Sequence, residues 1–298
     1  MDPGNVAANI SAGAKFGFLL VWVILLAHVM AGLVQYLSAK LGLTTGRSLP
    51  ELVAENCRTP TRLAFWVQAE MVAVATDLAE VVGGAIALQL LFGLPMLVGG
   101  VITGVVSMCL LSVQNRGSQR AFERIIAGLL MIITIGFLTS LIVDPPAPSA
   151  VLGGVVPHFA GPESLLLATA ILGATVMPHV VYLHSGLARD RHGKPETGAP
   201  LRHMLRVTRF DVGLAMVVAG AVNLSMLLVA ATHLQGVEGT DTIAGAHAAV
   251  GNALGPAVAL CFAIGLLASG LASSSVGAYA GAMIMQGLLN RSYPLLLR

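Results

Sequence analysis

Seven long apolar stretches constrain this chain more than any other feature of its sequence. They cover residues 16–39, 63–92, 95–114, 123–143, 163–188, 208–232 and 254–287. A helix needs about 20 apolar residues to cross the hydrocarbon layer of a bilayer. Only 10% of the residues are charged, whereas a soluble domain usually carries about 25%. The sequence therefore predicts an all-α membrane protein that crosses the bilayer several times.

The basic residues test this map, because lysine and arginine favour cytoplasmic loops. Except for Lys15, every lysine and arginine falls in loops 40–62, 115–124 and 189–209, at the edges of these loops, or near the C-terminal end. The intervening loops carry none, so the basic residues alternate between the two sides of the membrane. We therefore expect these loops to be cytoplasmic in a multi-pass protein of the cell membrane. The small net charge of +2 gives no indication of nucleic-acid binding, and the oligomeric state stays open.

The first residues do not fit a full crossing. Segment 5–15 is too short to span alone, and the charge pattern requires it to end on the outer side. We expect the chain to begin inside its first transmembrane helix, which gives about seven full spans and one half-helix.

That half-helix starts with the run Asp2-Pro3-Gly4-Asn5. Proline removes a backbone donor and glycine relaxes the backbone, so carbonyl groups freed at such a break face a cation together with the Asp2 carboxylate. The alternative is an ordinary helix cap, since aspartate before a proline at the first helical position is common. Four residues alone do not separate these two interpretations.

A second break is predicted within span 163–188. Pro178 lies in the middle of that span, where proline costs about 3 kcal/mol in a helix. The missing N–H of Pro178 leaves the carbonyl of Ala174 without its helical partner, and Met177 is close enough in sequence to face the same point. The alternative is a simple proline kink with Met177 as packing.

Taken together, the two breaks predict a metal-ion site. Broken helices at corresponding places in two halves of a chain are a sequence pointer to a transporter site. Asp2, Asn5 and the Ala174 carbonyl offer oxygen ligands, and Met177 offers a thioether sulfur. A sulfur ligand favours transition metals over Mg²⁺ and Ca²⁺. We therefore predict a divalent transition-metal ion as cargo, with no resident cofactor.

Span 63–92 carries three carboxylates near one stripe: Glu70, Asp77 and Glu80. Charged groups within a bilayer are costly and mark ion or proton pathways. A structural polar network between helices is the alternative. His179 follows Pro178 directly, and histidine changes charge near neutral pH, so we add it to the predicted proton pathway.

Other polar residues within the spans are assigned to structure. His28 and His184 are interpreted as structural, and Asn223 as a packing residue that could also assist the site. Cys57, Cys109 and Cys261 are too widely spaced for a zinc motif or a disulfide framework. His179 and His184 do not form an HExxH motif, and the chain carries no nucleophile–base pattern. The sequence therefore does not predict an enzyme.

Several motifs resemble those of the Nramp family, whose bacterial members of the MntH type are proton-coupled manganese transporters. The matching runs are Asp2–Asn5, Ala75–Glu80, Ala174–His179, Tyr182–Ser185, Leu267–Leu271 and Met285–Gly287. Two positions depart from the family pattern, since Val180 replaces a usual asparagine and Ala282 a common glutamine. The retained Asn5 and Met177 argue against the magnesium-transporting relatives.

The resemblance implies a LeuT-like bundle built from two inverted repeats. Residues 1–298 would form one transmembrane domain, with residues 1–143 as the first repeat and 163–298 as part of the second, and both ends of the family fold would lie outside this chain. The resemblance narrows the predicted cargo to Mn²⁺ or Fe²⁺. It also implies metal ligation by Asp2, Asn5, Ala174 and Met177 and proton handling by His179, Asp77, Glu80 and Glu70. Two alternatives remain open: a LeuT-like symporter for a small organic substrate, and a shortened protein that binds metal without transporting it.

Overall fold

A computed structural model describes residues 2–115, 119–193, 197–240 and 242–291 of the chain, and the regular elements within these residues are helices. The predicted basic residues Arg116, Lys194 and Arg298 lie outside the described residues. The elements in chain order are α1 (Pro3–Phe16), η1 (Gly17–Leu20), α2 (Val21–Thr45), α3 (Leu49–Asn56), α4 (Thr59–Phe92), α5 (Met96–Asn115), α6 (Gln119–Val143), α7 (Pro148–Gly153), α8 (Pro162–Thr175), α9 (Pro178–His192), α10 (Ala199–His233), α11 (Ile243–Leu254) and α12 (Pro256–Leu289).

Each of the seven predicted spans coincides with helix, so the all-α prediction is confirmed. Within the described residues, five helical stretches are long and apolar enough to cross a membrane. They are Pro3–Thr45, Thr59–Phe92, Pro162–His192, Ala199–His233 and Pro256–Leu289, and Met96–Ser112 is a shorter apolar helix. The predicted loops also contain three short helices, α3, α7 and α11, which the apolar pattern does not reveal.

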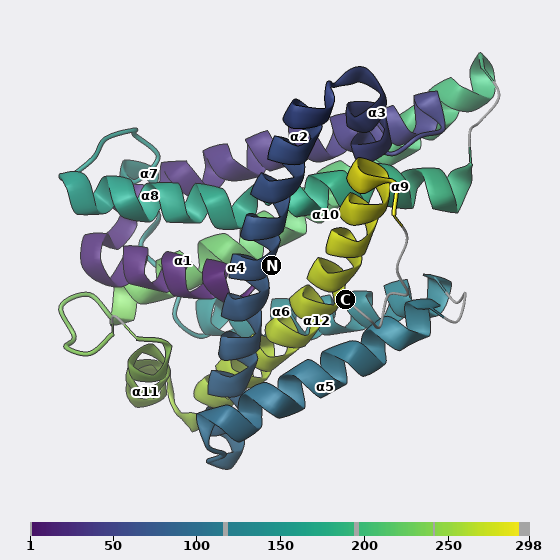
Figure 1. Cartoon of the computed structure of the whole chain (residues 1–298). Coiled ribbons are helices and arrows are strands. Elements are labelled where there is room, and N and C mark those ends of the chain that lie inside the picture. Colours follow the sequence, from purple (N-terminus) through teal and green to yellow (C-terminus); the bar gives the residue numbers. More distant parts are fainter. Residues whose placement is uncertain (1, 116–118, 194–196, 241, 292–298) are drawn as a thin grey trace.

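The helices form two crossing sets (Figure 1). Helices α2, α8, α9 and α10 run roughly alongside one another, while α4 and α12 cross them. Helix α1 packs on α10 and α8, and α12 packs on α4 and α6. The N-terminal end of the chain lies near the middle of the bundle beside α4, where Pro3 touches Gly83 so closely that an added Cβ would come within 2.2 Å of the proline Cβ.

Glycines let the helices of the first set approach at backbone distance. A Cβ added to Gly42 of α2 would lie 2.1 Å from the carbonyl oxygen of Ser185 on α9. A Cβ added to Gly13 of α1 would lie 2.3 Å from the carbonyl oxygen of Leu227 on α10. Small residues allow such close packing in membranes, where helices gain little from apolar burial alone. The broken helices are thus held against continuous neighbours.

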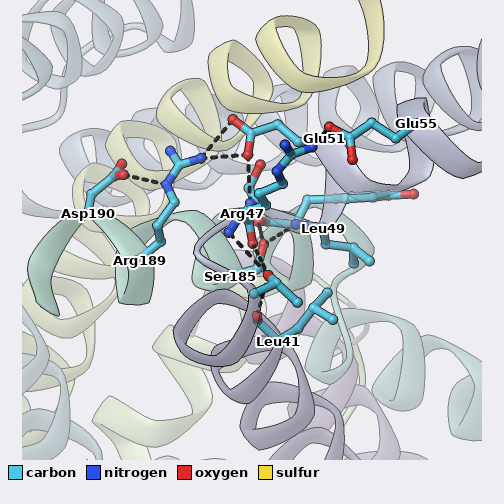
Figure 2. Close-up of polar contacts among 11 residues, drawn as sticks. Leu41, Arg47, Leu49, Glu51, Glu55, Ser185, Arg189 and Asp190 are labelled. Atoms are coloured by element: carbon cyan, nitrogen blue, oxygen red, sulfur yellow. Dashed lines mark hydrogen bonds and ion pairs between the residues drawn. The ribbon is translucent and has the colours of Figure 1, made fainter. Parts of the chain in front are cut away.

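A polar cluster ties α3 to the last turn of α9 (Figure 2). Both carboxylate oxygens of Glu51 accept from Nη1 of Arg189 at 2.7 Å, and the Arg189 Nε donates to Asp190. The backbone N–H of Leu49 donates to Ser185 Oγ at 2.8 Å. Burial alone would raise the pKa of the Glu51 carboxyl, but the bonds and charge of Arg189, with bonds from Ser48, hold that pKa below its ordinary value.

Candidate metal-ion site

The first helix begins at Asp2, which is buried and has an extended backbone. Its Oδ1 accepts the backbone N–H of Asn5 at 3.2 Å, and Pro3 occupies the first turn of α1. Asp2 therefore caps α1, a geometry that both interpretations of this run allow. Gly4 is helical rather than part of an extended break, and a Cβ at this position would lie 2.8 Å from Asp2 Oδ2. Its missing side chain therefore leaves room for the carboxylate.

The break predicted at Pro178 separates α8 from α9. Helix α8 ends at Thr175, Val176 and Met177 leave the helical conformation, and Pro178 opens α9. Met177 thus stands before α9 as Asp2 stands before α1, each followed by a proline at the start of the helix. The two breaks are built by the same local chemistry, because proline is tolerated in the first turn, where its missing N–H costs nothing.

Asn5 joins the two breaks. Its Nδ2 donates to the Ala174 carbonyl oxygen at 2.8 Å and also to Asp2 Oδ1. The carbonyl that the sequence identifies as freed by Pro178 is therefore within hydrogen-bonding distance of the first helix. Because the Asn5 Nδ2 donates to both, Asp2 Oδ1 and the Ala174 carbonyl oxygen lie close to the same point.

A cavity of about 140 Å³ lies beside this point. Its lining includes Asn5, Ala174 and Met177 of the predicted ligand set. Asp2 does not line the cavity and reaches it through its bond to Asn5. The remaining lining residues are His28, Gln35, Thr175, Val180, Met216, Ala219 and Asn223.

Polar residues outside the predicted ligand set surround the same cavity. The Nδ2 of Asn223 lies 3.4 Å from Asn5 Oδ1 and 3.2 Å from His28 Nε2. Thr175 Oγ1 donates to Asn5 Oδ1 at 3.3 Å. His184 Nδ1 lies 2.7 Å from Oε1 of Gln35, another lining residue. For His28 and Gln35 in α2 and Asn223 in α10, the signal that could have found them is a polar side chain in the apolar middle of a helix.

The predicted proton pathway meets the site at Asp2. His179 and Glu80 are each 1% exposed, and Asp2 lies within electrostatic range of both. In the described part of the chain, His179 Nδ1 and Glu80 Oε2 have no hydrogen-bond partner. Buried polar atoms are normally satisfied, so such atoms suggest a functional role.

The other two carboxylates lie on the same helix, α4. Asp77 is half-buried, and a Cβ at Gly277 of α12 would lie 2.5 Å from Asp77 Oδ1 and 3.3 Å from Glu80 Oε2. This glycine therefore lets α12 close over the Asp77–Glu80 pair. Glu70 is also half-buried and lies two turns before Asp77.

Within the described residues, no group of three or more histidine, cysteine, aspartate or glutamate side chains could hold a metal ion. The predicted ligand set is of another kind, because it combines one carboxylate with an amide, a backbone carbonyl and a thioether. Such a set offers mixed oxygen and sulfur donors with a single negative charge, which suits a divalent transition metal that must also be released.

The chain matches the family described as Natural resistance-associated macrophage protein-like (Nramp) over residues 1–298. Among curated relatives, the divalent metal cation transporter MntH of Mycobacterium tuberculosis is 65% identical over the whole chain, which covers 70% of that protein. The corresponding protein of Bacillus subtilis is 47% identical, and the chain again covers 70% of it.

A solved structure has the same fold. The manganese transporter of Eremococcus coleocola, in complex with an aromatic bis-isothiourea compound, superposes with a TM-score of 0.89 at 30% sequence identity. The match covers 100% of this chain and 65% of that transporter, so the chain spans just under two thirds of its length. The predicted LeuT-like fold is thereby confirmed, while the division into repeats 1–143 and 163–298 stays a prediction.

Proposed function

The chain belongs to the Nramp family, and we propose that it serves proton-coupled uptake of divalent transition-metal ions, Mn²⁺ or Fe²⁺, across the cytoplasmic membrane. The observation that carries the proposal is that the capped start of α1 and the interruption between α8 and α9 meet beside one cavity. The relatives in Mycobacterium tuberculosis and Bacillus subtilis are divalent metal cation transporters, and the structural relative is a manganese transporter. The metal ion is cargo, so the proposal needs no resident cofactor.

Four groups would hold the ion: the Asp2 carboxylate, the Asn5 amide oxygen, the Ala174 carbonyl and the Met177 sulfur. Asp2 Oδ1 and the Ala174 oxygen already share the Asn5 Nδ2 as donor. For Asn5 to become a ligand, its amide must turn so that Oδ1 faces these oxygens. The Asn223 Nδ2, which donates to Oδ1 at 3.4 Å, would then lose that acceptor, whereas the Thr175 hydroxyl keeps the Ile171 carbonyl at 2.7 Å. Asn223 would thus help to set the energy of the turn.

The size of the cavity supports an ion over an organic substrate. Its volume is about 140 Å³, whereas pockets for drug-sized ligands usually enclose about 300–1,000 Å³. The Asp2 carboxylate at its edge also disfavours an anionic substrate. A partly hydrated cation fits both features, which argues against a LeuT-like symporter for a small organic molecule.

Proton coupling would use the acid–base groups that face Asp2. The positive ion and a proton compete for the same negative charge, and His179 and Glu80 lie within electrostatic range of it. Asp77 and Glu70 extend this line of groups along α4. Binding of the cation beside Asp2 would therefore change the proton affinity of its neighbours, which is the physical basis of coupling between sites.

Titration calorimetry of the purified chain tests the site. We expect Mn²⁺ and Cd²⁺ to bind, and Met177→Ala to weaken Cd²⁺ binding by at least about tenfold, or 1.4 kcal/mol, while weak Ca²⁺ binding hardly changes. A thioether prefers a soft cation, so the loss must be selective. Met216→Ala is the matched control, because Met216 lines the same cavity but is not a proposed ligand.

Equal losses for Cd²⁺ and Ca²⁺, or equal effects of the two methionine variants, would contradict the ligand assignment. Uptake of Mn²⁺ into proteoliposomes with an inward proton gradient then tests transport. Selective metal binding without any uptake would instead favour the second candidate, a metal-binding membrane protein that does not transport.

A further inference from the structure

An apolar groove of about 460 Å³ runs between α2 and α10 on the outside of the bundle. The side chains along it are strongly exposed, with Val29 70% and Val217 69% accessible. Leu25 and Leu33 continue the same face of α2. Within the described residues this apolar surface is uncovered, and its composition suits contact with lipid tails.

Glycines hollow the groove from both helices. Gly32 of α2 and Gly213 and Gly220 of α10 are among its lining residues. A Cβ at Gly213 would meet nothing within 4 Å, so this position is open space within the groove. A Cβ at Gly220 would lie 3.2 Å from the His28 ring, which forms the floor at that level.

Basic residues stand at one end of the groove. Arg209 precedes Gly213 by one turn, or about 6 Å of helix rise, and Arg202 and Arg206 continue the same stripe toward the start of α10 at helical spacing. All three arginines are exposed, and none of them forms an ion pair within the described part of the chain. The groove thus continues into a row of unpaired positive charges.

Helix α2 adds a fourth positive charge at the same level. The two helices run antiparallel, since Gly32 faces Met216 and Leu43 packs beside Leu205. This register places the exposed Lys40 level with Arg209. Both residues belong to the predicted cytoplasmic boundary, where anionic headgroups attract basic residues.

The inner wall of the groove is shared with the candidate metal-ion site. His28 and Met216 line both the groove and the 140 Å³ cavity. His28 is fixed between the Ile24 carbonyl, 2.8 Å from Nδ1, and the Asn223 amide, 3.2 Å from Nε2. A molecule in the groove would therefore press on the outer faces of two side chains whose inner faces bound the cavity.

We propose that the groove binds an anionic phospholipid, with its phosphate at Lys40, Arg206 and Arg209 and one acyl chain between α2 and α10. The groove is lined largely by apolar side chains of α2 and α10, which suits an acyl chain. The charges select the headgroup, since apolar contacts alone do not distinguish one lipid tail from another. The site does not depend on which ion is transported.

Lipid competition measured by native mass spectrometry tests this assignment. The intact chain is reconstituted in nanodiscs with equal phosphatidylglycerol and phosphatidylcholine, and we expect phosphatidylglycerol to be retained preferentially. Arg209→Gln should reduce that preference about fivefold, the contribution of one basic residue near an anionic surface. Arg58→Gln is the matched control, because Arg58 is also exposed at a predicted cytoplasmic loop but lies before α4.

Filling the groove tests the acyl chain separately. Gly213→Leu places a side chain in open space and should abolish preferential retention, while Gly128→Leu, at an exposed glycine of α6 with nothing within 4 Å of its Cβ, should leave it unchanged. Phosphatidylglycerol with a diazirine on its acyl chain should label residues 24–33 and 213–224.

Three results would overturn the proposal: equal retention of both lipids by the unchanged chain, equal effects of a groove variant and its control, or labelling confined to other helices. Displacement of the lipid by millimolar inorganic phosphate alone would also contradict it, because that result would assign the site to a free anion.

Discussion

Gly4→Ala tests whether the Asp2 carboxylate must occupy its present position for metal binding. An added Cβ would lie 2.8 Å from Asp2 Oδ2 and 3.8 Å from the carboxylate carbon. Real Cβ contacts essentially never fall below 3.0 Å, so the carboxylate must turn or the first turn of α1 must move. Apart from the chain neighbours Pro3 and Asn5 and the backbone of α1 itself, no atom of the described residues other than those of Asp2 comes within 4 Å of the new methyl group. The perturbation is therefore confined to one proposed ligand.

Two effects on stability oppose each other. Alanine is favoured over glycine in a helix by about 0.5–1 kcal/mol, whereas a weakened cap costs about 0.5–2 kcal/mol. The net change in the free energy of unfolding should therefore stay within about 1.5 kcal/mol. No opposing effect compensates a loss of metal affinity, and misorienting a ligand typically lowers that affinity about 10- to 100-fold. We expect a folded protein with much weaker Mn²⁺ binding.

The assay is Mn²⁺ titration calorimetry, with thermal unfolding in the same detergent as the stability measurement. Gly173→Ala is the matched control, because Gly173 lies in α8 close to the other break, and its Cβ would meet nothing within 4 Å. The reasoning would be refuted by an Mn²⁺ affinity of Gly4→Ala within twofold of that of the unchanged chain. A large loss in the control as well would show that helix backbone, rather than the carboxylate, is being perturbed.

Two further perturbations address other parts of the molecule. Gly277→Ala brings a methyl group to 2.5 Å from Asp77 Oδ1. The pH dependence of Mn²⁺ uptake should therefore weaken, while the Mn²⁺ affinity stays within about threefold, or 0.7 kcal/mol. An unchanged pH profile of uptake in proteoliposomes would contradict a role for the Asp77–Glu80 pair. Glu51→Gln should lower the free energy of unfolding by about 0.5–1 kcal/mol, since partial exposure screens the ion pair with Arg189. The pKa of Glu51 is lowered in the folded chain. The stability contributed by the ion pair is therefore fully present at pH values above the ordinary pKa of glutamate, and it disappears as the pH falls through the lowered pKa. The free energies of unfolding of the variant and the unchanged chain should consequently converge in acid.

The membrane-spanning helices were predictable because lipid imposes a simple rule. A backbone that crosses hydrocarbon must satisfy its own hydrogen bonds, so long apolar stretches become helices. Pro178 likewise predicted its break, since a mid-span proline frees a carbonyl wherever it occurs. These features depend on local chemistry, which a single sequence carries in full.

The short helices between the spans depend on signals that the apolar pattern does not contain. Helix α3 is set by a capping box, in which the Ser48 N–H donates to Glu51 at 2.8 Å. Helix α11 begins at Thr242, whose hydroxyl accepts the Gly245 N–H at 3.0 Å. Capping residues are the sequence signature of such helices. Here these residues lie within segments that the apolar pattern predicts only as loops between the spans.

The sequence leaves Asn223 open between packing and assisting the site and assigns His28 to structure, because the contacts of both residues depend on distance rather than on residue type. An amide in the middle of an apolar helix packs equally well against any polar neighbour, and only the approach of α10 to α1 places Asn223 Nδ2 at 3.4 Å from Asn5 Oδ1. That approach requires glycine at Gly13, where a side chain would collide with the backbone of α10. The polar surroundings of the cavity therefore depend on the close packing of Gly13 against Leu227, Ala230 and Ala231, none of which has a polar side chain. A sequence search for such sites should consequently look for glycines at helix crossings as well as for ligands.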